Sequence, residues 1–297
     1  MNFVKHANID KAKWDALVEI STCPSLYLLS WYLDATCHWD AIVWGDYEAV
    51  IPLPTKRFLF FKKLYQPIFV QKSGLCCKTN KQPTLLLKEF FNSNVPRQFS
   101  SFRMHFSHEL NIPKEILPKK HKIETKKNYS LDLSQDYPSL QRQFNQNRKR
   151  NLKKARELGW KTEETYNIEH AIKMYKTHQA KKQGKLTKDV FIAIESIFKE
   201  CMQRKMGKLV LCKNNTGDEL SYGFFVEYHK RIYYLFGAMN DEGRKHSAIS
   251  LIFNDVIRNH AGGDFILDFE GGNLEGIGNY FASFNSVVEE YPCVHYP

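Results

Sequence analysis

Three apolar runs separated by short polar turns lie next to one another in the second half of the sequence. They cover Lys208 to Lys213, Leu220 to Glu227 and Arg231 to Ala238, and the turns between them are Asn214 to Gly217 and Tyr228 to Lys230. Short runs rich in aromatic and branched residues and bounded by turn residues are typical of strands joined by hairpins. The sequence therefore predicts an antiparallel meander of three strands.

Helical patterns flank this meander. Pro138 in a first turn and Gly159 at the end mark one helix, which at about 1.5 Å per residue would be roughly 30 Å long. Asn167 is a typical N-cap for the next helix. The expected helices are 138–158, 168–183, 188–205, 247–260 and 276–284, with a strand over 264–270 and a last strand over 287–296.

The N-terminal half repeats the order of helices, strands, helix and strand. We expect helices over 11–20, 26–36 and 84–91, a hairpin over 41–52 that turns at Gly45 and Asp46, and strands over 65–71 and 100–106. No residue-level identity joins the halves, but the shared order predicts two related α/β units, residues 1–127 and 128–297.

The stretch DFILDFEGG, which begins at Asp264, ends a strand with two acids and two glycines. Side chains alternate along a strand, so Leu267 and Phe269 share the core face, and Asp268 and Glu270 share the other. Two carboxylates this close together disfavour each other's ionisation, which suits a general base. The alternative is that they cap the glycine turn or pair with arginine.

The charge of the chain is uneven. The net charge is +11, and the segment from Arg142 to Lys161 holds eight Lys and Arg against one acid, Glu157. Such asymmetry points to an anionic partner, although a solvated helix face would look the same. Arg148 falls in phase with the apolar side of its helix, where it needs a carboxylate or phosphate. We therefore expect Arg148 and Glu270 to border one common hollow.

Three stretches resemble a known family: FNQNRKRNLKKARELGWKTEE from Phe144, RIYYLFGAMNDEGRKHSAISLIFNDVIR from Arg231, and DFEGGNLEGIGNYFASFN from Asp268. They resemble tandem GNAT-fold acyltransferases, in particular the Fem-type aminoacyltransferases and their bacterial relatives. The resemblance implies an α/β (α+β) fold of two GNAT-like units in tandem, each a mixed, largely antiparallel sheet flanked by helices. It implies transfer of an acyl or aminoacyl group onto an amine in a cleft between the halves. Phe281 stands where that family has lysine, and Asn285 where it has glycine.

Amine acylation needs a base, oxyanion donors and a cradle for the phosphates of the donor. The expected catalytic residues are Glu270, Asp268 and Tyr234. The expected substrate- or cofactor-binding residues are Arg148, Arg150, Gly243, Arg244, Lys245, His246, Tyr222 and Gln71. Each of these stretches also has an ordinary structural explanation: a capped turn, a polar loop before a helix, and strand tyrosines that pack at the edge of a core. We expect no permanently bound cofactor, and acyl-CoA or aminoacyl-tRNA as the donor substrate.

Other classes of protein fit less well. His105 and His108 have no acid or Cys partner for a metal, and there is no P-loop or GxSxG motif. Seven cysteines, no apolar leader and no apolar run long enough to cross a bilayer favour a cytoplasmic protein. A tRNA- or nucleic-acid-binding protein, or a catalytically inert Fem-like paralogue, remain the alternatives to an enzyme.

Overall fold

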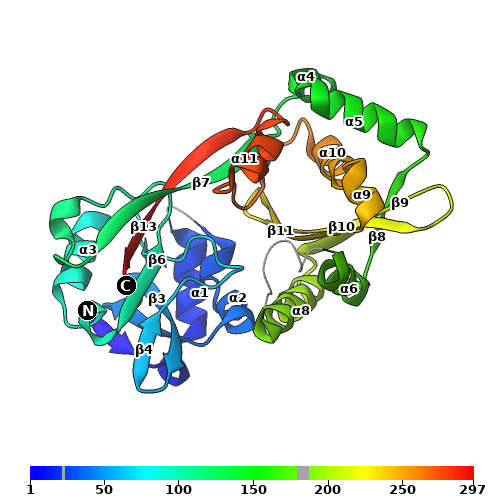
Figure 1. Ribbon diagram of the computed structural model, residues 1–297. Coiled ribbons are helices and arrows are strands. Elements are labelled where there is room, and N and C mark those ends of the chain that lie inside the picture. Colours follow the sequence, from blue (N-terminus) through cyan, green and yellow to red (C-terminus); the bar gives the residue numbers. More distant parts are fainter. Residues whose placement is uncertain (22–23, 179–186) are drawn as a thin grey trace. The chain divides into compact units, whose positions relative to one another are not determined.

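The computed structural model describes residues 1–21, 24–178 and 187–297 (Figure 1). These form two compact units: unit 1 is Met1–Lys127 with Glu289–Pro297, and unit 2 is Asn128–Val288. The first boundary falls inside strand β7 (Lys122–Asp132), close to the residue that the sequence analysis used. The last nine residues group with unit 1 because strand β13 (Val287–Tyr296) pairs antiparallel with β6 (Ser101–His105) from Cys293 to Tyr296.

Unit 1 is a mixed sheet with helices on it. Its strands follow the order β1-β2-β3-β4-β6-β13, with β5 paired to β3. The bounds are β1 Asn2–Val4, β2 Trp39–Trp44, β3 Ala49–Phe58, β4 Phe61–Leu64 and β5 Cys76–Cys77. The helices are α1 (Lys11–Ile20), α2 (Ser30–Thr36) and α3 (Pro83–Asn92), and short 3-10 helices cover His6–Asn8, Leu26–Leu28, Pro96–Gln98 and Lys114–Ile116.

The strands of unit 2 follow the order β7-β12-β11-β10-β9-β8. Its further strands are β8 Lys161–Thr165, β9 Gly207–Lys213, β10 Glu219–Tyr228, β11 Arg231–Met239 and β12 Ile266–Asp268. The helices are α4 Tyr137–Gln143, α5 Gln146–Glu157, α6 Ile168–His178, α8 Lys188–Gln203, α9 Asp241–Lys245, α10 Ile249–His260 and α11 Glu275–Ala282.

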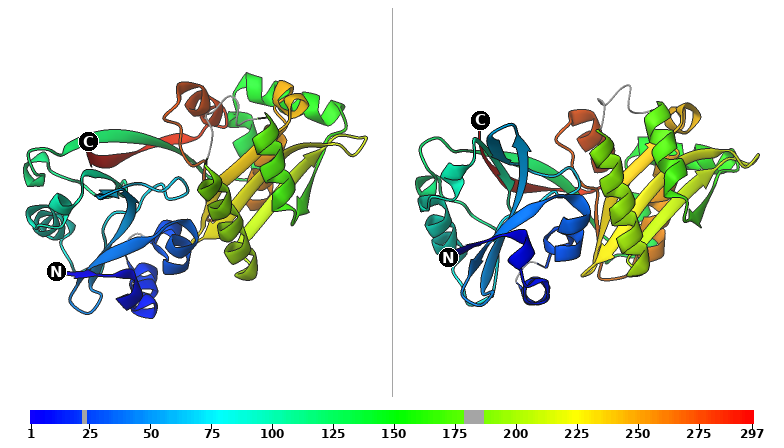
Figure 2. Two further views of the ribbon diagram at one scale, coloured as in Figure 1. Left: turned by 60° about the horizontal axis from the view of Figure 1, so that its bottom comes forward. Right: turned by 90° about the horizontal axis from the view of Figure 1, so that it is seen from below.

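Helices cover both faces of the unit 2 sheet, and aromatic contacts show which helix covers which face. Phe224 of β10 meets Phe198 of α8, with ring centroids 5.3 Å apart. The next residue, Phe225, points the other way and meets Phe253 of α10 at 5.7 Å. Figure 2 shows α6 and α8 lying across the yellow strands on one side. The other face packs on α10, with α5 and α11 completing that layer.

The two units repeat one order of elements. In unit 1 the antiparallel strands β2, β3 and β4 are followed by α3 and then by β6, which is parallel to β4. In unit 2 the antiparallel strands β9, β10 and β11 are followed by α9, α10 and then by β12, which is parallel to β11. The repeated order that the sequence predicted is present in the structure.

Several predicted elements have different bounds. The long helix is broken, because Phe144 is extended (ψ 143°) and Asn145 starts α5 by accepting a hydrogen bond from the backbone N–H of Arg148. The strand expected over 65–71 is wrong, since β4 ends at Leu64 and pairs with β3 before that segment. Strands β1, β4, β5, β7 and β8 were not predicted. Asn167 does cap α6, through the N–H of His170, but residues 179–183 of that prediction lie outside the described residues.

Candidate functional site

Strands β11 and β12 separate soon after they pair. The parallel ladder joins Arg231 to Ile266 and ends with Tyr233 beside Asp268, whereas β11 continues to Met239. From Tyr234 to Ala238, no strand of the described residues pairs with β11 on the β12 side. We call this segment the β11 edge. Its outward-pointing backbone groups have no ladder partner, so they can hydrogen-bond an extended, amide-bearing molecule.

The β11 edge also contains a bulge. Phe224 of β10 is paired with Phe236 of β11, and Phe225 with Tyr234, so Leu235 is an extra residue. A bulge of this kind bends a strand and re-aims its side chains, and bulges are common beside active sites. As a result, Tyr234 and Phe236 face opposite sides of the sheet: Tyr234 contacts Phe253 of α10, and Phe236 contacts Tyr175 of α6.

Asp268, at the end of β12, is completely buried and holds a network of hydrogen bonds. Its Oδ2 accepts from Nε of Arg231 at 2.7 Å, and its Oδ1 accepts from Nδ2 of Asn128 at 2.8 Å. The same Oδ1 accepts from the backbone N–H of Glu270 at 3.0 Å, and Asn128 accepts from the N–H of Gly271. With its oxygens bound to three donors, Asp268 orders the turn after β12. Asp268 therefore pairs with an arginine and caps the glycine turn, which is the alternative role that the sequence left open.

Glu270 lies in that turn with a left-handed backbone, φ 56°, which is uncommon for a residue other than glycine. The turn is completed by Gly271 and Gly272, and a Cβ on Gly272 would lie 2.3 Å from the ring of Tyr129. Such local strain persists only where the surroundings hold it, and it clusters at functional sites. The half-buried Glu270 is therefore held rigidly just beyond the last paired residues of β11 and β12.

Arg148 of α5 is buried to 2% exposure among neutral partners. Its Nε and Nη2 donate to Oγ of Ser283 at 3.0 and 2.9 Å, and its Nη1 donates to Oγ of Ser250. The guanidinium carbon lies 4.2 Å from the ring centroid of Tyr280 and 4.5 Å from that of Phe284. Burial lowers the pKa of this guanidinium, with Tyr280 opposing the effect. The sequence predicted that this position would be buried but not that its partners would be hydroxyls and rings.

Arg148 and Asp268 lie on opposite faces of the sheet. Leu267 and Phe269 belong to the core that packs on α5, α10 and α11, so Asp268 between them points to the other face. Neither Asp268 nor Glu270 is among the described partners of Arg148. Asp268 therefore faces away from Arg148, and the expectation that Arg148 and Glu270 border one common hollow stays a prediction.

Tyr234 lies on the same face as Arg148. Its hydroxyl lies over Gly237, since a Cβ on that glycine would come within 1.7 Å of it. Burial raises the pKa of Tyr234, and the nearby Tyr280 adds to the effect. Burial also raises the pKa of Tyr280, whose hydroxyl is hydrogen-bonded to Ser250 at 2.9 Å. Tyr234 thus places a protonated hydroxyl on the β11 edge.

The stretch around Gly243 forms a helix of its own rather than a loop before α10. Asn240 caps α9 by accepting from the N–H of Gly243, and a Cβ on Gly243 would lie 2.2 Å from the carbonyl oxygen of Leu220. This glycine therefore permits close packing of α9 on β10, which is a structural reason for it. Arg244 donates to the carbonyl of His178 at 3.2 Å.

The two residues that follow are less constrained. Lys245 is exposed, and His246 lies edge-on to Trp160. Partial desolvation and the neighbouring Lys154 and Lys245 lower the pKa of His246. A phosphate-binding role for this stretch stays a prediction.

The other three predicted residues lie on other elements than Tyr234. Tyr222 is fully buried on β10, and burial together with Glu219 raises its pKa. Gln71 belongs to unit 1, where its carbonyl oxygen is hydrogen-bonded to Nδ1 of His105 at 2.9 Å. Arg150 is exposed on α5 and donates to Asn147. Their proposed roles also stay predictions.

Sequence reasoning missed several residues that organise the site. Asn128 was missed because β7 was not recognised as a strand, and Arg231 because it opens a strand like many solvated arginines. Ser250, Tyr280 and Ser283 lie on α10 and α11, in stretches that were considered only for their apolar spacing. The sequence did carry one signal, because Arg148 falls in phase with the apolar side of its helix. A buried arginine needs hydrogen-bond partners, and hydroxyl groups on neighbouring helices can supply them.

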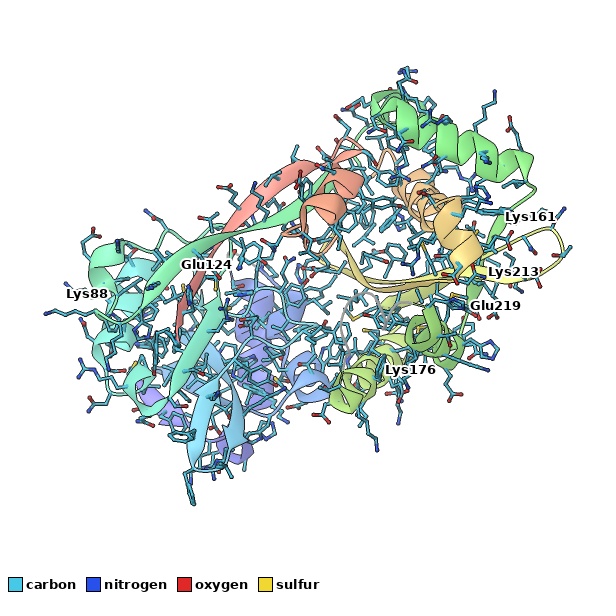
Figure 3. The ribbon with its side chains drawn as sticks, in the orientation of Figure 1. Lys88, Glu124, Lys161, Lys176, Lys213 and Glu219 are labelled. Atoms are coloured by element: carbon cyan, nitrogen blue, oxygen red, sulfur yellow. The ribbon has the colours of Figure 1, made fainter. Side chains whose placement is uncertain are left out.

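The outer face of α5 is basic. Arg150, Lys153, Lys154 and Arg156 are exposed there, and the acid Glu157 lies 3.8 Å from Lys153. Figure 3 shows that the basic segment ends at Lys161 on β8, beside Lys213 of β9, with which it is paired in the ladder. This surface can bind a polyanion.

Comparison with known proteins supports the fold. No family model and no curated protein matches this chain. Among solved structures, FemX superposes with a TM-score of 0.70 at 13% identity and covers 98% of this chain and 97% of its own. A tandem GNAT protein from the clavulanic acid biosynthesis pathway superposes with a TM-score of 0.58 at 11% identity, and the match covers 100% of this chain and 98% of that protein. L-PGS from Bacillus licheniformis superposes with a TM-score of 0.57 at 10% identity, and the match covers 97% of this chain and 91% of that protein.

The predicted fold class is therefore confirmed. The protein consists of two GNAT-like units in tandem, each a mixed, largely antiparallel sheet flanked by helices. Within the part of the chain that the structure describes, none of the helices has the length and apolarity needed to span a bilayer.

Proposed function

We propose that the protein transfers an acyl or aminoacyl group onto an amine, and that the reaction takes place at the β11 edge. The observation that carries this proposal is the early separation of β11 and β12, which leaves backbone groups from Tyr234 to Ala238 without a ladder partner beside a bulge at Leu235. Attack of an amine on a carbonyl creates an oxyanion, and fixed backbone N–H groups are suited to stabilise it. The likeness to FemX and to a tandem GNAT protein supports the same class of reaction.

Tyr234 would act as the general acid. Because burial raises its pKa, its hydroxyl keeps its proton at neutral pH and can give it to the departing thiolate or alkoxide as the tetrahedral intermediate collapses. The bond to the leaving group breaks, the new amide forms, and the phenol is restored by a proton from the attacking amine.

Glu270 would accept that proton from the amine and pass it on to the phenolate of Tyr234, or would hold the amine. It follows the last residue of β12 by two positions, and its backbone is fixed by a hydrogen bond to Asp268. Asp268 would act only through this contact, as a positioning residue, since its own oxygens are bound by Arg231 and Asn128. This assigns different roles to the two acids that the sequence analysis considered together.

The basic face of α5 favours a donor that carries a long polyanion. Four exposed cations within two turns suit the backbone of a tRNA better than the few phosphates of a coenzyme. Aminoacyl-tRNA is therefore the preferred donor, and acyl-CoA, the ligand named with the tandem GNAT neighbour, is the second.

The test is a transfer assay with the full chain. Radiolabelled aminoacyl-tRNA and acetyl-CoA are offered in separate reactions with a panel of primary amines. We expect transfer from one of them, a fall of about 10²-fold or more in kcat for Tyr234→Phe, and a similar fall for Glu270→Gln.

Tyr166→Phe is the matched control, because Tyr166 is 74% exposed in the same unit. If neither donor gives product, or if both variants retain full activity, the proposal is wrong. Binding of tRNA without turnover would instead support a nucleic-acid-binding protein.

A further inference from the structure

The hairpin formed by β3 and β4 ends in an exposed apolar turn. The register pairs Phe58 with Phe61, so Leu59 and Phe60 form the two-residue turn between the strands. Leu59 is 77% exposed, Phe60 is fully exposed and Phe61 is 56% exposed. The turn lies at the periphery of unit 1 (Figure 1). Such turns are usually polar, so three adjacent exposed apolar side chains need an explanation.

The backbone of the turn adds a second observation. Leu59 has φ 52°, in the left-handed region that two-residue hairpin turns require and that asparagine and glycine adopt most easily. Leu59 is the one residue of this turn with a positive φ, so a sequence chosen for folding alone would place glycine at position 59. Keeping Leu-Phe there costs conformational free energy and exposes apolar surface, which indicates that the side chains serve a binding role.

Cations follow the apolar tip on both strands. Residues 55–65 contain Lys56, Arg57, Lys62 and Lys63 and no acid, and the ladder sets Lys56 opposite Lys63 and Arg57 opposite Lys62. Lys62 is paired with Asp40 at 2.9 Å. The other three have no acidic partner among the described residues. At about 3.3 Å per residue, they lie roughly 7–10 Å behind the tip.

We infer that this hairpin binds the surface of an anionic lipid bilayer, with Leu59, Phe60 and Phe61 inserted below the headgroups and Lys56, Arg57 and Lys63 on the lipid phosphates. The spacing matches the roughly 5–10 Å depth to which interfacial segments bury their apolar side. The three cations complement the negative surface, and each adds to the affinity. A single-stranded nucleic acid would also meet cations and rings, but the aliphatic Leu59 at the apex offers no face for base stacking.

The experiment is co-sedimentation of the full chain with vesicles of phosphatidylcholine, with and without phosphatidylglycerol, over a series of salt concentrations. We expect binding to the anionic vesicles that weakens as salt rises. Leu59→Gly with Phe60→Asn removes the apolar tip and places glycine at the position that has a positive φ, so the fold is retained. This double variant should lower the vesicle affinity at least tenfold, because burial of even one such side chain is worth more than a factor of ten.

A charge variant and a surface control complete the design. Lys56→Gln with Lys63→Gln should lower the affinity about fivefold for each charge removed, and only on anionic vesicles. Leu85→Asn, which alters another exposed leucine of unit 1, should leave binding unchanged. The inference is overturned if the protein does not sediment with anionic vesicles, or if the tip variant binds them as well as the original chain does. Binding to a short single-stranded RNA is measured in parallel. The inference is also overturned if the tip variant loses binding to that RNA but not to the vesicles. This test does not depend on transferase activity.

Discussion

The guanidinium of Arg148 lies 4.2 Å from the ring centroid of Tyr280, and no carboxylate of the described residues lies within ion-pair distance of it. Residues 22–23 and 179–186, which the structure does not describe, include no Asp or Glu. A buried cation held by hydroxyls and rings costs free energy, because neutral partners return only part of its hydration. We infer that this arginine is kept for an anionic ligand rather than for stability.

Replacement of Arg148 by methionine tests that inference. We expect the free energy of unfolding to stay level or to rise by about 1–4 kcal/mol, since a buried charge is exchanged for an apolar side chain of similar length. Ser250 and Ser283 keep other partners at Tyr280. Stabilisation by phosphate or citrate in a thermal-unfolding assay should disappear in the variant. A loss of several kcal/mol would show instead that Arg148 contributes to folding.

Asp268→Ala should destabilise unit 2. The change leaves Arg231 without this partner and removes the acceptor for Asn128, so we expect a loss of about 3–5 kcal/mol in urea-induced unfolding. Asp268→Asn, which keeps an acceptor oxygen for Asn128, should lose less. If both variants unfold at the original urea concentration, the network does not order the turn.

The stability of unit 1 should fall in mild acid. Burial lowers the pKa of His121 to about 4 from its usual 6.5, and neither ring nitrogen has a hydrogen-bond partner among the described residues. The unfolded chain binds a proton at this position below pH 6.5 while the folded chain does not. Stability is therefore full above pH 6.5 and is lost as the pH falls towards 4, by about 1–3 kcal/mol.

His121→Phe removes that loss while it retains the ring contacts with Phe102 and Tyr296. The slope of unfolding free energy against pH between 6.5 and 4 should be shallower in the variant. Some slope remains, because burial also lowers the pKa of His105 to about 4. An unchanged slope would mean that His121 is not buried in its neutral form.

Gly243→Ala should cost at least about 1–3 kcal/mol, because its Cβ would press on the carbonyl oxygen of Leu220, a backbone atom that has little freedom to move. Gly276→Ala is the matched control. It lies in the first turn of α11 with nothing near its Cβ position, so it should be neutral or stabilising by up to about 1 kcal/mol. Equal effects in thermal unfolding would contradict the close packing of α9 on β10.

Much of the fold was accessible from the sequence because it depends on local signals. The meander, α3, α8 and α11 came from apolar spacing and turn residues, and their bounds differ from the structure by only a few residues. The break at Phe144 was not accessible. Its extended backbone is fixed by an Asn145 cap inside a helical pattern, and Pro138 and Gly159 at the outer ends concealed it.

The candidate site was less accessible, because it depends on pairings between distant segments. Asp268 and Glu270 are two residues apart, yet one is bound by a strand that begins near residue 122 and the other lies in a left-handed turn. Alternation predicted correctly that Leu267 and Phe269 face the core. Alternation alone does not say which layer of helices covers a face, so the position of Arg148 relative to Asp268 required coordinates.

The extra residue in β11 has a consequence for how such a protein can change over generations. In a regular strand Tyr234 and Phe236 would point the same way, whereas here they serve opposite helical layers. Loss of Leu235 alone would make Tyr234 and Phe236 adjacent residues of a regular strand, so each ring would keep its layer and only the bend of the strand would be lost. A one-codon deletion is thus a short path to a descendant with the same core and a straighter β11 edge.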